Sequence, residues 1–523
     1  MLSKTNWIVQ KFGGTSVGKF PEQIVDEIIK VFTTQLHNDV AVVCSARSSD
    51  TKAEGTTSRL LRACDMVCNN EEDFSEVVRK VREDHVENAR KLIHDPKLQE
   101  KLINDTVAEL ETVEKYLNAS LVLNEVSSRT MDLVMSCGEK LSCLFMSALC
   151  NDHGVPSVYV DLSSIIPQNY ECPEGTLDTS FYTFLVGAFK DRLRPVLELQ
   201  AQGKPVVPVI TGFFGLVPMG LLNGVGRGYT DLCAALIAVA LNADELQVWK
   251  EVDGIFTADP RKVPQARLLS SVTPEEASEL TYYGSEVIHP FTMEQVIRAK
   301  IPIRIKNVQN PRGDGTVIYP DNVAKKGEAT PPHPPVTLSS SFFEHKRRGA
   351  TAITSKSDIV VVNIHSNKKT LSHGFLAQIF STLDKYKLVV DLISTSEVHV
   401  SMALPVPDLE SSKALKKAVD ELKKVGTVDL TKKLVIISLV GKQMKQFIGI
   451  AGTMFTTLAE QGINIEMISQ GANEINISCV IDQEDAIKAL KSIHAKLLDT
   501  ENSESSLGKA VNEKLEQIKR LEL

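Results

Sequence analysis

The sequence predicts an α/β protein in which a mostly parallel sheet is sandwiched by helices and followed by two small α+β units. From Trp7 to about Ile318, short β-rich runs alternate with helical runs, as in a parallel sheet covered on both faces. Beyond residue 350 a pattern of apolar positions occurs twice, which indicates an internal duplication. The chain has 523 residues, of which 43% are hydrophobic, and this is enough for several cores.

The alternation can be followed along the first part of the chain. We expect strands at 39–45, 205–211 and 245–249 and helices at 58–67 and 232–241. Residues 71–126 are rich in charge, have helical periodicity and show few strand signals, so we expect a helical insertion there.

A proline-rich segment separates the two parts. Residues 325–348 contain four prolines between 331 and 335, and neither a helix nor a central strand tolerates that density. The basic run at 345–348 could be a localisation signal, but the end of a solvated linker is the simpler interpretation. The boundaries we expect are 1–320 for the first domain with its insertion at 71–126, 321–350 for the linker, 351–430 and 431–500 for the duplicated units, and 501–523 for a tail.

The duplicated units share a pattern of apolar residues. Phe380, Leu383, Val390 and Ile393 recur 75 positions later as Phe455, Leu458, Ile465 and Ile468, and after a two-residue insertion Val398 and Val400 recur as Ile475 and Ile477. Each copy predicts a helix, a turn, an extended run and a second strand. A purely structural duplication and a pair of ligand-binding modules both fit this pattern.

Charge and cysteine usage exclude some classes of partner. A formal net charge of -8 argues against nucleic acid and an anionic membrane surface as partners. The longest apolar stretch, 206–222, is interrupted by prolines and glycines and does not predict a membrane span. Nine cysteines without C-x-x-C pairs predict reduced thiols in a cytoplasmic protein. Cys64 and Cys68 are one helical turn apart and fit a shared helix face better than a metal site.

A glycine-rich turn follows the first predicted strand. Gly13 and Gly14 let backbone N–H groups approach an anion, Ser16 adds a hydroxyl, and Lys11 adds a positive charge. An ordinary strand-to-helix turn would use the same glycines. A second anion-binding motif is therefore needed before a phosphate site is inferred.

Such a motif lies at 224–231, directly before the most apolar predicted helix. Arg227 offers a two-pronged grip on a carboxylate or phosphate, and Asp231 can hold a lysine or Mg²⁺. Thr230 and Asp231 could also cap the helix. No G-x-x-x-x-G-K-[ST] motif occurs, and the run at 224–228 lacks the G-x-G-x-x-G spacing, so neither a P-loop nor a Rossmann site is predicted.

Four motifs, taken in order, resemble those of the aspartokinases in the amino-acid kinase family, closest to the monofunctional fungal type. They are KFGGTSV at 11–17, SCGE at 136–139, GRGYTD at 226–231 and VDGIFTADPR at 252–261. The resemblance covers nearly the whole chain and implies the amino-acid-kinase fold followed by two ferredoxin-like ACT domains. It also implies transfer of the ATP γ-phosphoryl group, with Mg²⁺, to the side-chain carboxylate of L-aspartate, the first step of threonine and methionine biosynthesis.

The resemblance implies roles for individual residues. Lys11 is expected on the transferring phosphoryl group and Asp231 beside it as the second catalytic residue, while Gly13, Gly14 and Ser16 cradle the phosphates. The expected substrate pocket consists of Ser45, Thr57, Glu139, Phe213, Arg227 and Thr230. Within it Arg227 would grip the α-carboxylate and Glu139 the α-ammonium group, although a structural ion pair between the two would use the same charges. No metal ligand is predicted from the protein itself.

The nucleotide site follows from the same resemblance. Five residues at and after a predicted strand are expected to contact it: Lys250, Glu251, Phe256, Arg261 and Lys262. Glu251 and Phe256 stand where bacterial relatives often have Asp and Tyr, and Glu286 replaces a lysine of the family, so these contacts can differ from theirs. His289 precedes a proline and is either a structural turn residue or one that influences turnover through hydrogen bonding.

ACT domains usually bind a small amino acid in the seam between two copies and pair edge to edge. The resemblance to fungal enzymes therefore implies threonine as a feedback inhibitor and a homo-oligomer assembled through these domains. The side chains do not distinguish threonine from lysine or methionine. The effector site is expected at His373, Gly374, Phe375, Ser394, Thr395, Ser396, Gly471, Ala472 and Asn473.

Two other functions stay open at this point. An amino-acid kinase acting on glutamate, carbamate or UMP would share the fold, but Glu139 with Arg227 and the tandem units favour aspartate. A catalytically silent amino-acid sensor on the same scaffold would be expected to lack Lys11 or Asp231, and the chain has both.

Overall fold

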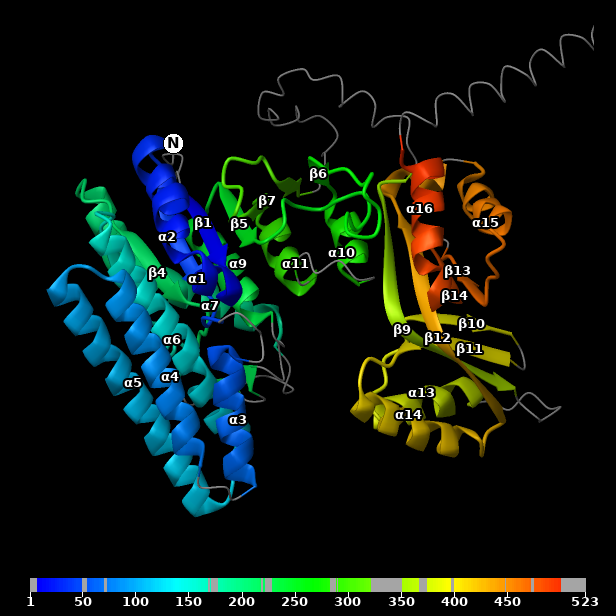
Figure 1. Cartoon of the computed structure of the whole chain (residues 1–523), viewed down its shortest axis with the longest axis horizontal. Helices are drawn as coiled ribbons and strands as arrows, with labels where there is room; N and C mark the ends of the chain where they lie inside the picture. Colours follow the sequence, from blue (N-terminus) through cyan, green and yellow to red (C-terminus); the bar gives the residue numbers. More distant parts are fainter. Residues whose placement is uncertain are drawn as a thin grey trace, which may run out of the picture. The chain divides into compact units, whose positions relative to one another are not determined.

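The chain forms two compact units (Figure 1). The computed structural model describes residues 7–48, 54–69, 73–167, 170, 177–217, 220–221, 228–282, 288, 290–320, 350–365, 374–396, 399–446, 448–471 and 475–499. Unit 1 consists of residues 1–255, 270–274 and 288–322, and unit 2 of 256–269, 275–287 and 323–523. Two segments before residue 320 thus group with the C-terminal unit, whereas the sequence suggested an uninterrupted first domain.

Unit 1 is built on an eight-stranded sheet in the order β3-β4-β2-β1-β5-β7-β8-β6. The strands from β3 to β7 in this order are parallel neighbours, and among the described strands of this sheet only the β7–β8 pair is antiparallel. The predicted mostly parallel sheet is therefore confirmed. Its strands are β1 (Trp7–Phe12), β2 (Asp39–Cys44), β3 (Ser157–Val160), β4 (Val207–Thr211), β5 (Glu245–Lys250), β6 (Ser271–Val272), β7 (Ile303–Asn307) and β8 (Thr316–Ile318).

Helices cover the sheet of unit 1. Alternate residues of β1 face opposite sides. Phe12 therefore packs with Trp249 in the core under α6 (Ser128–Asp152) and the π-helical turns η1 (Ile24–Ile29) and η2 (Val31–Gln35), while Lys11 faces α9 (Tyr229–Leu241). The apolar helix α9 is buried over nearly its whole length and packs beside α7 and α11. The helices are α1 (Gly14–Lys19), α2 (Pro21–Gln23), η1 (Ile24–Ile29), η2 (Val31–Gln35), α3 (Thr56–Cys68), α4 (Phe74–Leu92), α5 (Pro96–Leu123), α6 (Ser128–Asp152), α7 (Thr179–Ala201), α9 (Tyr229–Leu241) and α11 (Pro290–Arg298).

The segment expected as a helical insertion contains the hairpin of α4 and α5, which lies beside α3 and α6 (Figure 1). Asp95 caps α5 by accepting hydrogen bonds from the backbone N–H groups of Lys97 and Leu98, and Pro96 occupies the first helical turn, where its missing N–H costs nothing. Asn124 ends the helix in the left-handed conformation.

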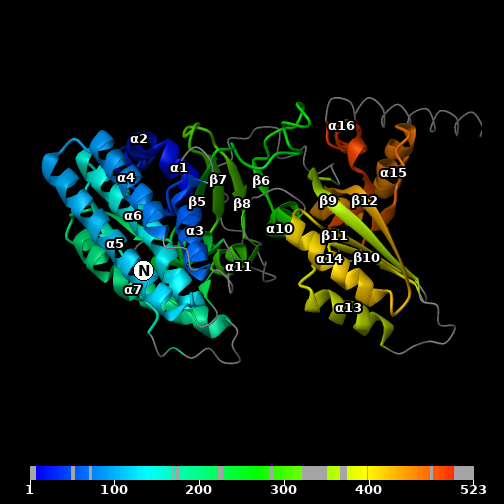
Figure 2. The same ribbon diagram turned by 60° about the horizontal axis from the view of Figure 1, so that its bottom comes forward.

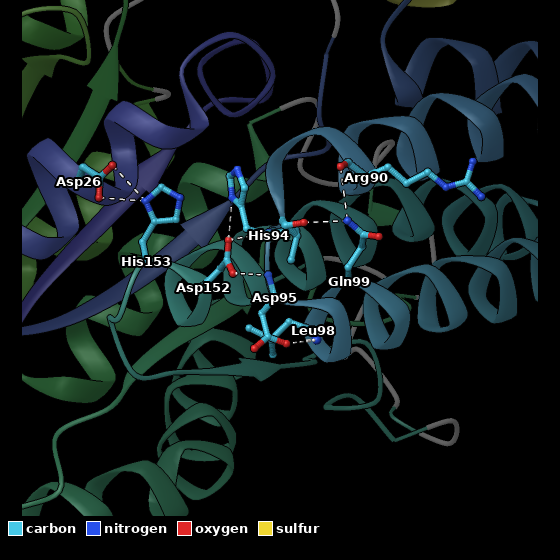
Figure 3. Close-up of polar contacts among 9 residues, drawn as sticks. Asp26, Arg90, His94, Asp95, Leu98, Gln99, Asp152 and His153 are labelled. Carbon is cyan, nitrogen blue, oxygen red and sulfur yellow. Dashed lines mark hydrogen bonds and ion pairs between the residues drawn. The ribbon is translucent and has the colours of Figure 1, made fainter.

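The turn between α4 and α5 is fastened to the end of α6 (Figure 3). Asp152 accepts hydrogen bonds from the backbone N–H groups of Asp95 at 2.8 Å and His94 at 2.9 Å. The next residue, His153, contacts Asp26 of η1 at 3.0 Å. One carboxylate thus ties the insertion to the core helix.

Helix α6 is the one helix in the described part of the chain that is long and apolar enough to cross a membrane by length and composition. The apolar window is 78% buried inside the structure, and Cys143, Met146 and Leu149 are fully enclosed. These properties are those of the central core helix of unit 1.

Unit 2 contains a six-stranded antiparallel sheet in the order β10-β11-β9-β12-β14-β13. The strands are β9 (Ala352–His365), β10 (Leu392–Thr395), β11 (His399–Pro405), β12 (Thr427–Val440), β13 (Met467–Ser469) and β14 (Asn476–Asp482). Its helices are α10 (Pro274–Tyr282), α13 (Phe375–Lys385), α14 (Leu409–Leu422), α15 (Ile450–Glu460) and α16 (Ala486–Leu497), with 3-10 turns η6 (Lys442–Gln446) and η7 (Gln483–Asp485).

The internal repeat is confirmed. Helices α13 and α15 begin 75 residues apart, as do β10 and β13, and β11 and β14 begin 77 apart because of the two-residue insertion. The long strands β9 and β12 pair along most of their length, so both copies share one sheet. One core lies under α13 and α14 and a second under α15 and α16, at the two ends of this sheet (Figure 2).

Candidate functional site

The predicted site residues of unit 1 gather at one edge of its sheet. Lys11 stands next to the last residue of β1, Ser45 directly follows β2, Phe213 follows β4, and Lys250 ends β5. These strands are parallel, so their carboxyl ends meet at the same edge. This edge is where α/β proteins usually bind their ligands.

Lys11 and Asp231 form an ion pair at this edge. The lysine Nζ lies 2.7 Å from Oδ1 of the aspartate, and the two side chains are 12% and 17% exposed. Helix α9 begins at Tyr229, and its N-cap is Gly228 without a side-chain cap. The capping alternative for Thr230 and Asp231 is therefore wrong, because both lie within the first turn and make other contacts.

Glu139 projects from α6 to the same place and is almost completely buried, at 1% exposed. The Thr230 hydroxyl donates a 2.7 Å hydrogen bond to its Oε1. Burial raises the pKa of Glu139 from 4.5 to about 7, although the hydroxyls of Thr230 and Tyr229, the charge of Lys11 and the Phe213 backbone act in the opposite direction. No well-formed hydrogen bond from the described residues reaches Oε2, so this buried oxygen can accept one from a ligand.

Two glycines allow these elements to approach closely. A Cβ on Gly212 would stand 2.4 Å from Cγ2 of Thr230, so only glycine lets the end of β4 meet the start of α9. A Cβ on Gly138 would stand 2.9 Å from the Cβ of Ala46. The surroundings of Glu139 therefore depend on the close packing of α6 against Ala46 and of the end of β4 against Thr230.

The first glycine-rich turn has two distinct parts. Gly13 has open space where a Cβ would lie, as a position that faces a ligand requires. Gly14 is needed for packing, because its Cβ would stand 1.9 Å from the carbonyl oxygen of Ala46. Ser16 is buried within α1. Among the glycines expected to cradle the phosphates, Gly13 is thus the one whose Cβ position is open, whereas Gly14 is required by packing.

Ser45 and Thr57, which are expected in the substrate pocket, lie directly after β2 and in the first turn of α3. Ser45 N–H donates a 3.1 Å hydrogen bond to the carbonyl of Phe12, which aligns the ends of β1 and β2. Thr57 is in the first turn of α3, beside Thr56, whose Cγ2 would stand 3.2 Å from a Cβ on Gly138. Phe213 is buried and its carbonyl accepts a hydrogen bond from Thr211.

The predicted nucleotide residues fall in two groups. Lys250 ends β5 and accepts a backbone hydrogen bond from Val308, and the exposed Glu251 follows it, both in unit 1. Phe256, Arg261 and Lys262 belong to unit 2. Phe256 pairs with Leu268, Arg261 makes a two-pronged contact with Asp259 at 3.0 Å, and Lys262 donates to Ser355 at 3.0 Å.

Among the described effector candidates, Gly374 occupies the position in the first copy of the repeat that Gly449 occupies in the second. Gly374 precedes α13 with φ 95°, as Gly449 precedes α15 with φ 92°. Ser394 and Thr395 are exposed on the edge strand β10, and Ser396 N–H donates to the carbonyl of His399. Phe375 begins α13, and Gly471 follows β13. Arg227, Glu286, His289, His373, Ala472 and Asn473 lie outside the described residues.

Sequence reasoning missed several residues of the site. Tyr229 reaches Glu139 from α9, and its own pKa is raised by burial and by that carboxylate. Gly138 carried a signal, because a glycine inside a helix indicates close packing. Within the described residues no group of three or more metal-ligating side chains comes together, and of the described cysteines Cys68 is the exposed one.

Comparison with known proteins gives the family and the fold of the chain. The model of the amino acid kinase family matches residues 6–307, and an ACT domain model matches residues 437–497. The structure of E. coli aspartokinase III in complex with lysine and aspartate (T-state) has a TM-score of 0.72 and 24% identity, covering 95% of this chain and all of that one. This likeness shows the fold.

Curated sequences give the closer relationship. The aspartokinase of Saccharomyces cerevisiae is 72% identical over 522 residues, covering 99% of this chain and 98% of the relative. The aspartokinase of Candida albicans is 63% identical, covering 98% of this chain and 94% of the relative. The chain therefore belongs to the amino acid kinase family and is an aspartokinase with a C-terminal ACT region.

Proposed function

We propose that the protein transfers the γ-phosphoryl group of ATP to the side-chain carboxylate of L-aspartate at the carboxyl edge of the unit 1 sheet. The Lys11–Asp231 ion pair beside the buried Glu139–Thr230 pair carries this proposal. Thr230 and Asp231 are neighbours on α9, so a cation for phosphate and an anion for ammonium stand close together. The relationship to fungal aspartokinases supports aspartate as the acceptor.

The chemistry needs charge compensation rather than a general base. An aspartate side chain has an ordinary pKa near 3.9 and is already ionised at neutral pH. Two like charges 4 Å apart repel by about 4 kcal/mol at an effective dielectric near 20. The groups that bring the carboxylate and the phosphates together must remove this repulsion.

Lys11 supplies the compensating charge. Its ammonium group is fixed by Asp231 and faces the sheet edge beside Gly13, where the backbone is open to a ligand. In this position it contacts the transferring phosphoryl oxygens, which gain negative charge in the transition state. Asp231 acts by orienting the lysine. Mg²⁺ bound with the nucleotide would supply further positive charge to the phosphates.

Glu139 recognises the α-ammonium group of aspartate. Its carboxylate is buried beside Thr230, and an arriving ammonium group stabilises the ionised form, whose pKa burial has raised to about 7. Arg227, on the adjoining glycine-rich segment, is proposed for the α-carboxylate. Ser45, Thr57 and Phe213 form the remaining wall, and Lys250 and Glu251 at the end of β5 contact the nucleotide.

Regulation is proposed for unit 2. E. coli aspartokinase III has been solved with lysine and aspartate bound. For this chain we propose threonine as the inhibitor, bound near Gly374, Phe375 and Ser394 to Ser396, and a homo-oligomer assembled through the ACT region. A cytoplasmic location accords with its reduced cysteines.

A coupled assay of ADP release with Mg-ATP and aspartate tests the activity. We expect ADP release that depends on aspartate and falls on replacing aspartate by glutamate. Binding of amino acids without ADP release would identify a silent sensor and contradict the proposal. A turnover that prefers glutamate, carbamate or UMP would assign another acceptor.

Titration of threonine, lysine and methionine in the same assay tests the effector. Threonine is expected to inhibit, and Ser394→Phe is expected to weaken inhibition while leaving uninhibited turnover unchanged. Unchanged inhibition in this variant would remove the exposed strand β10 from the effector site.

A further inference from the structure

The wall of the proposed aspartate pocket includes a short segment after β2, residues 45–48. Three hydrogen bonds hold it: Ser48 N–H to the carbonyl of Gly14 at 3.0 Å, Arg47 N–H to the Ser142 hydroxyl at 2.6 Å, and Thr56 N–H to the carbonyl of Arg47 at 3.1 Å. The last bond joins this segment to the start of α3. The positions of Ser45 and Thr57 are therefore coupled, because the segments that carry them are hydrogen-bonded to each other.

This wall rests directly against the helix that carries Glu139. Ala46 and Thr56 both lie within contact distance of the Cβ position of Gly138, at 2.9 and 3.2 Å. A displacement of either residue changes the distance between the wall and the Glu139 carboxylate. The width of the proposed pocket therefore depends on the residues that contact Arg47 and Thr56 on the side away from Glu139.

Asp84 of α4 holds the wall through Arg47. Its Oδ2 lies 2.6 Å from the Arg47 guanidinium and 3.7 Å from that of Arg59, and the Arg47 side chain is only 8% exposed. Arg47 also donates to the carbonyl of Asp84 at 3.3 Å. A buried guanidinium needs a charged partner, so loss of the Asp84 carboxylate would remove the close ion-pair partner of Arg47.

His85, the next residue of α4, holds the wall through Thr56. Its Nε2 lies 3.0 Å from the Thr56 hydroxyl, and both residues are buried. Burial, with the nearby charges of Arg47 and Arg59, lowers the pKa of His85 to about 3, so the ring is neutral. A neutral imidazole keeps this hydrogen bond throughout the working pH range.

We propose that Asp84 and His85 are positioning residues for the phosphoryl acceptor, so that the helical insertion sets the affinity for aspartate. Two consecutive residues of α4 clamp the two parts of the pocket wall, Arg47 and Thr56, without touching the sheet edge where Lys11 lies. This inference rests on the proposed function of the site. The ligand concerned is the acceptor amino acid, and the nucleotide is unaffected.

The experiment compares three variants of the full chain with the unmodified protein: Asp84→Asn, His85→Leu and His85→Gln. We expect Asp84→Asn and His85→Leu to raise KM for aspartate about tenfold, with KM for ATP within about twofold and kcat within about threefold. His85→Gln keeps a hydrogen-bonding group and is expected to recover most of the affinity. Thermal unfolding of each variant is measured alongside.

Arg82→Gln is the matched control, because Arg82 is also on α4 but contacts Glu114 of α5 at 3.0 Å. If Asp84→Asn raises KM for aspartate no more than Arg82→Gln does, or raises both KM values equally, the positioning role is overturned. Asp84 is 35% exposed, so its variant decides the question even if His85→Leu does not fold. An unmodified protein without aspartate-dependent ADP release would overturn the proposed function instead.

Discussion

The Nζ atom of Lys11 lies 2.7 Å from Oδ1 of Asp231, joining the end of β1 to the first turn of α9. Both side chains are mostly buried, so the pair is shielded from the solvent screening that weakens surface ion pairs. The contact holds a lysine ammonium at the sheet edge where the site residues gather. In the proposed reaction it stands ready for the phosphoryl group without reorganising.

Replacing Asp231 by Asn tests whether this orientation matters. The variant keeps the shape of the side chain but removes the charge that fixes Lys11, so we expect kcat to fall about 10²-fold with a smaller change in KM for aspartate. Steady-state kinetics with Mg-ATP measure both. Asp26→Asn, in an exposed contact with His153, is the control. A rise in KM without loss of kcat would assign Asp231 to substrate binding.

The raised pKa of Glu139 predicts a pH dependence. With a pKa of about 7 the carboxyl is increasingly protonated as the pH falls, and a protonated carboxyl cannot pair with an ammonium group. We expect kcat/KM for aspartate to fall about tenfold per pH unit below about 7. In Glu139→Gln, kcat/KM for aspartate should be lower than in the unmodified protein and should no longer fall as the pH drops below about 7. An unchanged limb in the variant would show that another group titrates.

Gly212→Ala tests the close approach of β4 and α9. The added Cβ would stand 2.4 Å from Thr230, whose side chain must move and lose its hydrogen bond to Glu139. We expect a higher KM for aspartate and a loss of about 1–3 kcal/mol in the free energy of unfolding. Gly187→Ala is the control, because Gly187 has open space within α7 and should gain about 0.5–1 kcal/mol. Equal effects of the two changes would contradict the packing argument.

Asp152→Asn tests the anchor of the helical insertion (Figure 3). The carboxylate accepts from two backbone N–H groups at the α4–α5 turn, and an amide nitrogen cannot accept from one of them. We expect a loss of about 1–2 kcal/mol in unfolding free energy, measured by denaturant. These hydrogen bonds lower the pKa of Asp152 despite burial, so its contribution is present above the unfolded pKa and lost as the pH falls through the folded value. Unchanged stability of the variant would show that water replaces the contact.

Much of the fold could be predicted because local patterns carry it. Alternating β-rich and helical runs predicted the parallel sheet, and the 75-residue spacing predicted the paired helices α13 and α15. The grouping of residues 256–269 and 275–287 with unit 2 could not be predicted. This grouping depends on contacts between distant parts of the chain, and the local pattern of apolar residues does not predict such contacts.

The site was predictable to the extent that its residues stand in motifs. Lys11, Glu139 and Asp231 lie in three motifs that the parallel sheet brings to one edge, and the roles given to them stay predictions. Asp84 and His85 lie on a charge-rich helical face that looks like any solvated surface. Only the fold reveals that these two residues contact Arg47 and Thr56.

The central claim is that the positive charge at the end of β1 cancels the repulsion between the reactants. Lys11→Met keeps the length of the side chain and removes that charge, so its kcat with Mg-ATP and aspartate is the most direct measurement. We predict a fall of at least about 10²–10³-fold, with KM for aspartate within about threefold and an unchanged far-UV spectrum. A folded variant whose kcat stays within about threefold of the unmodified protein would contradict the account.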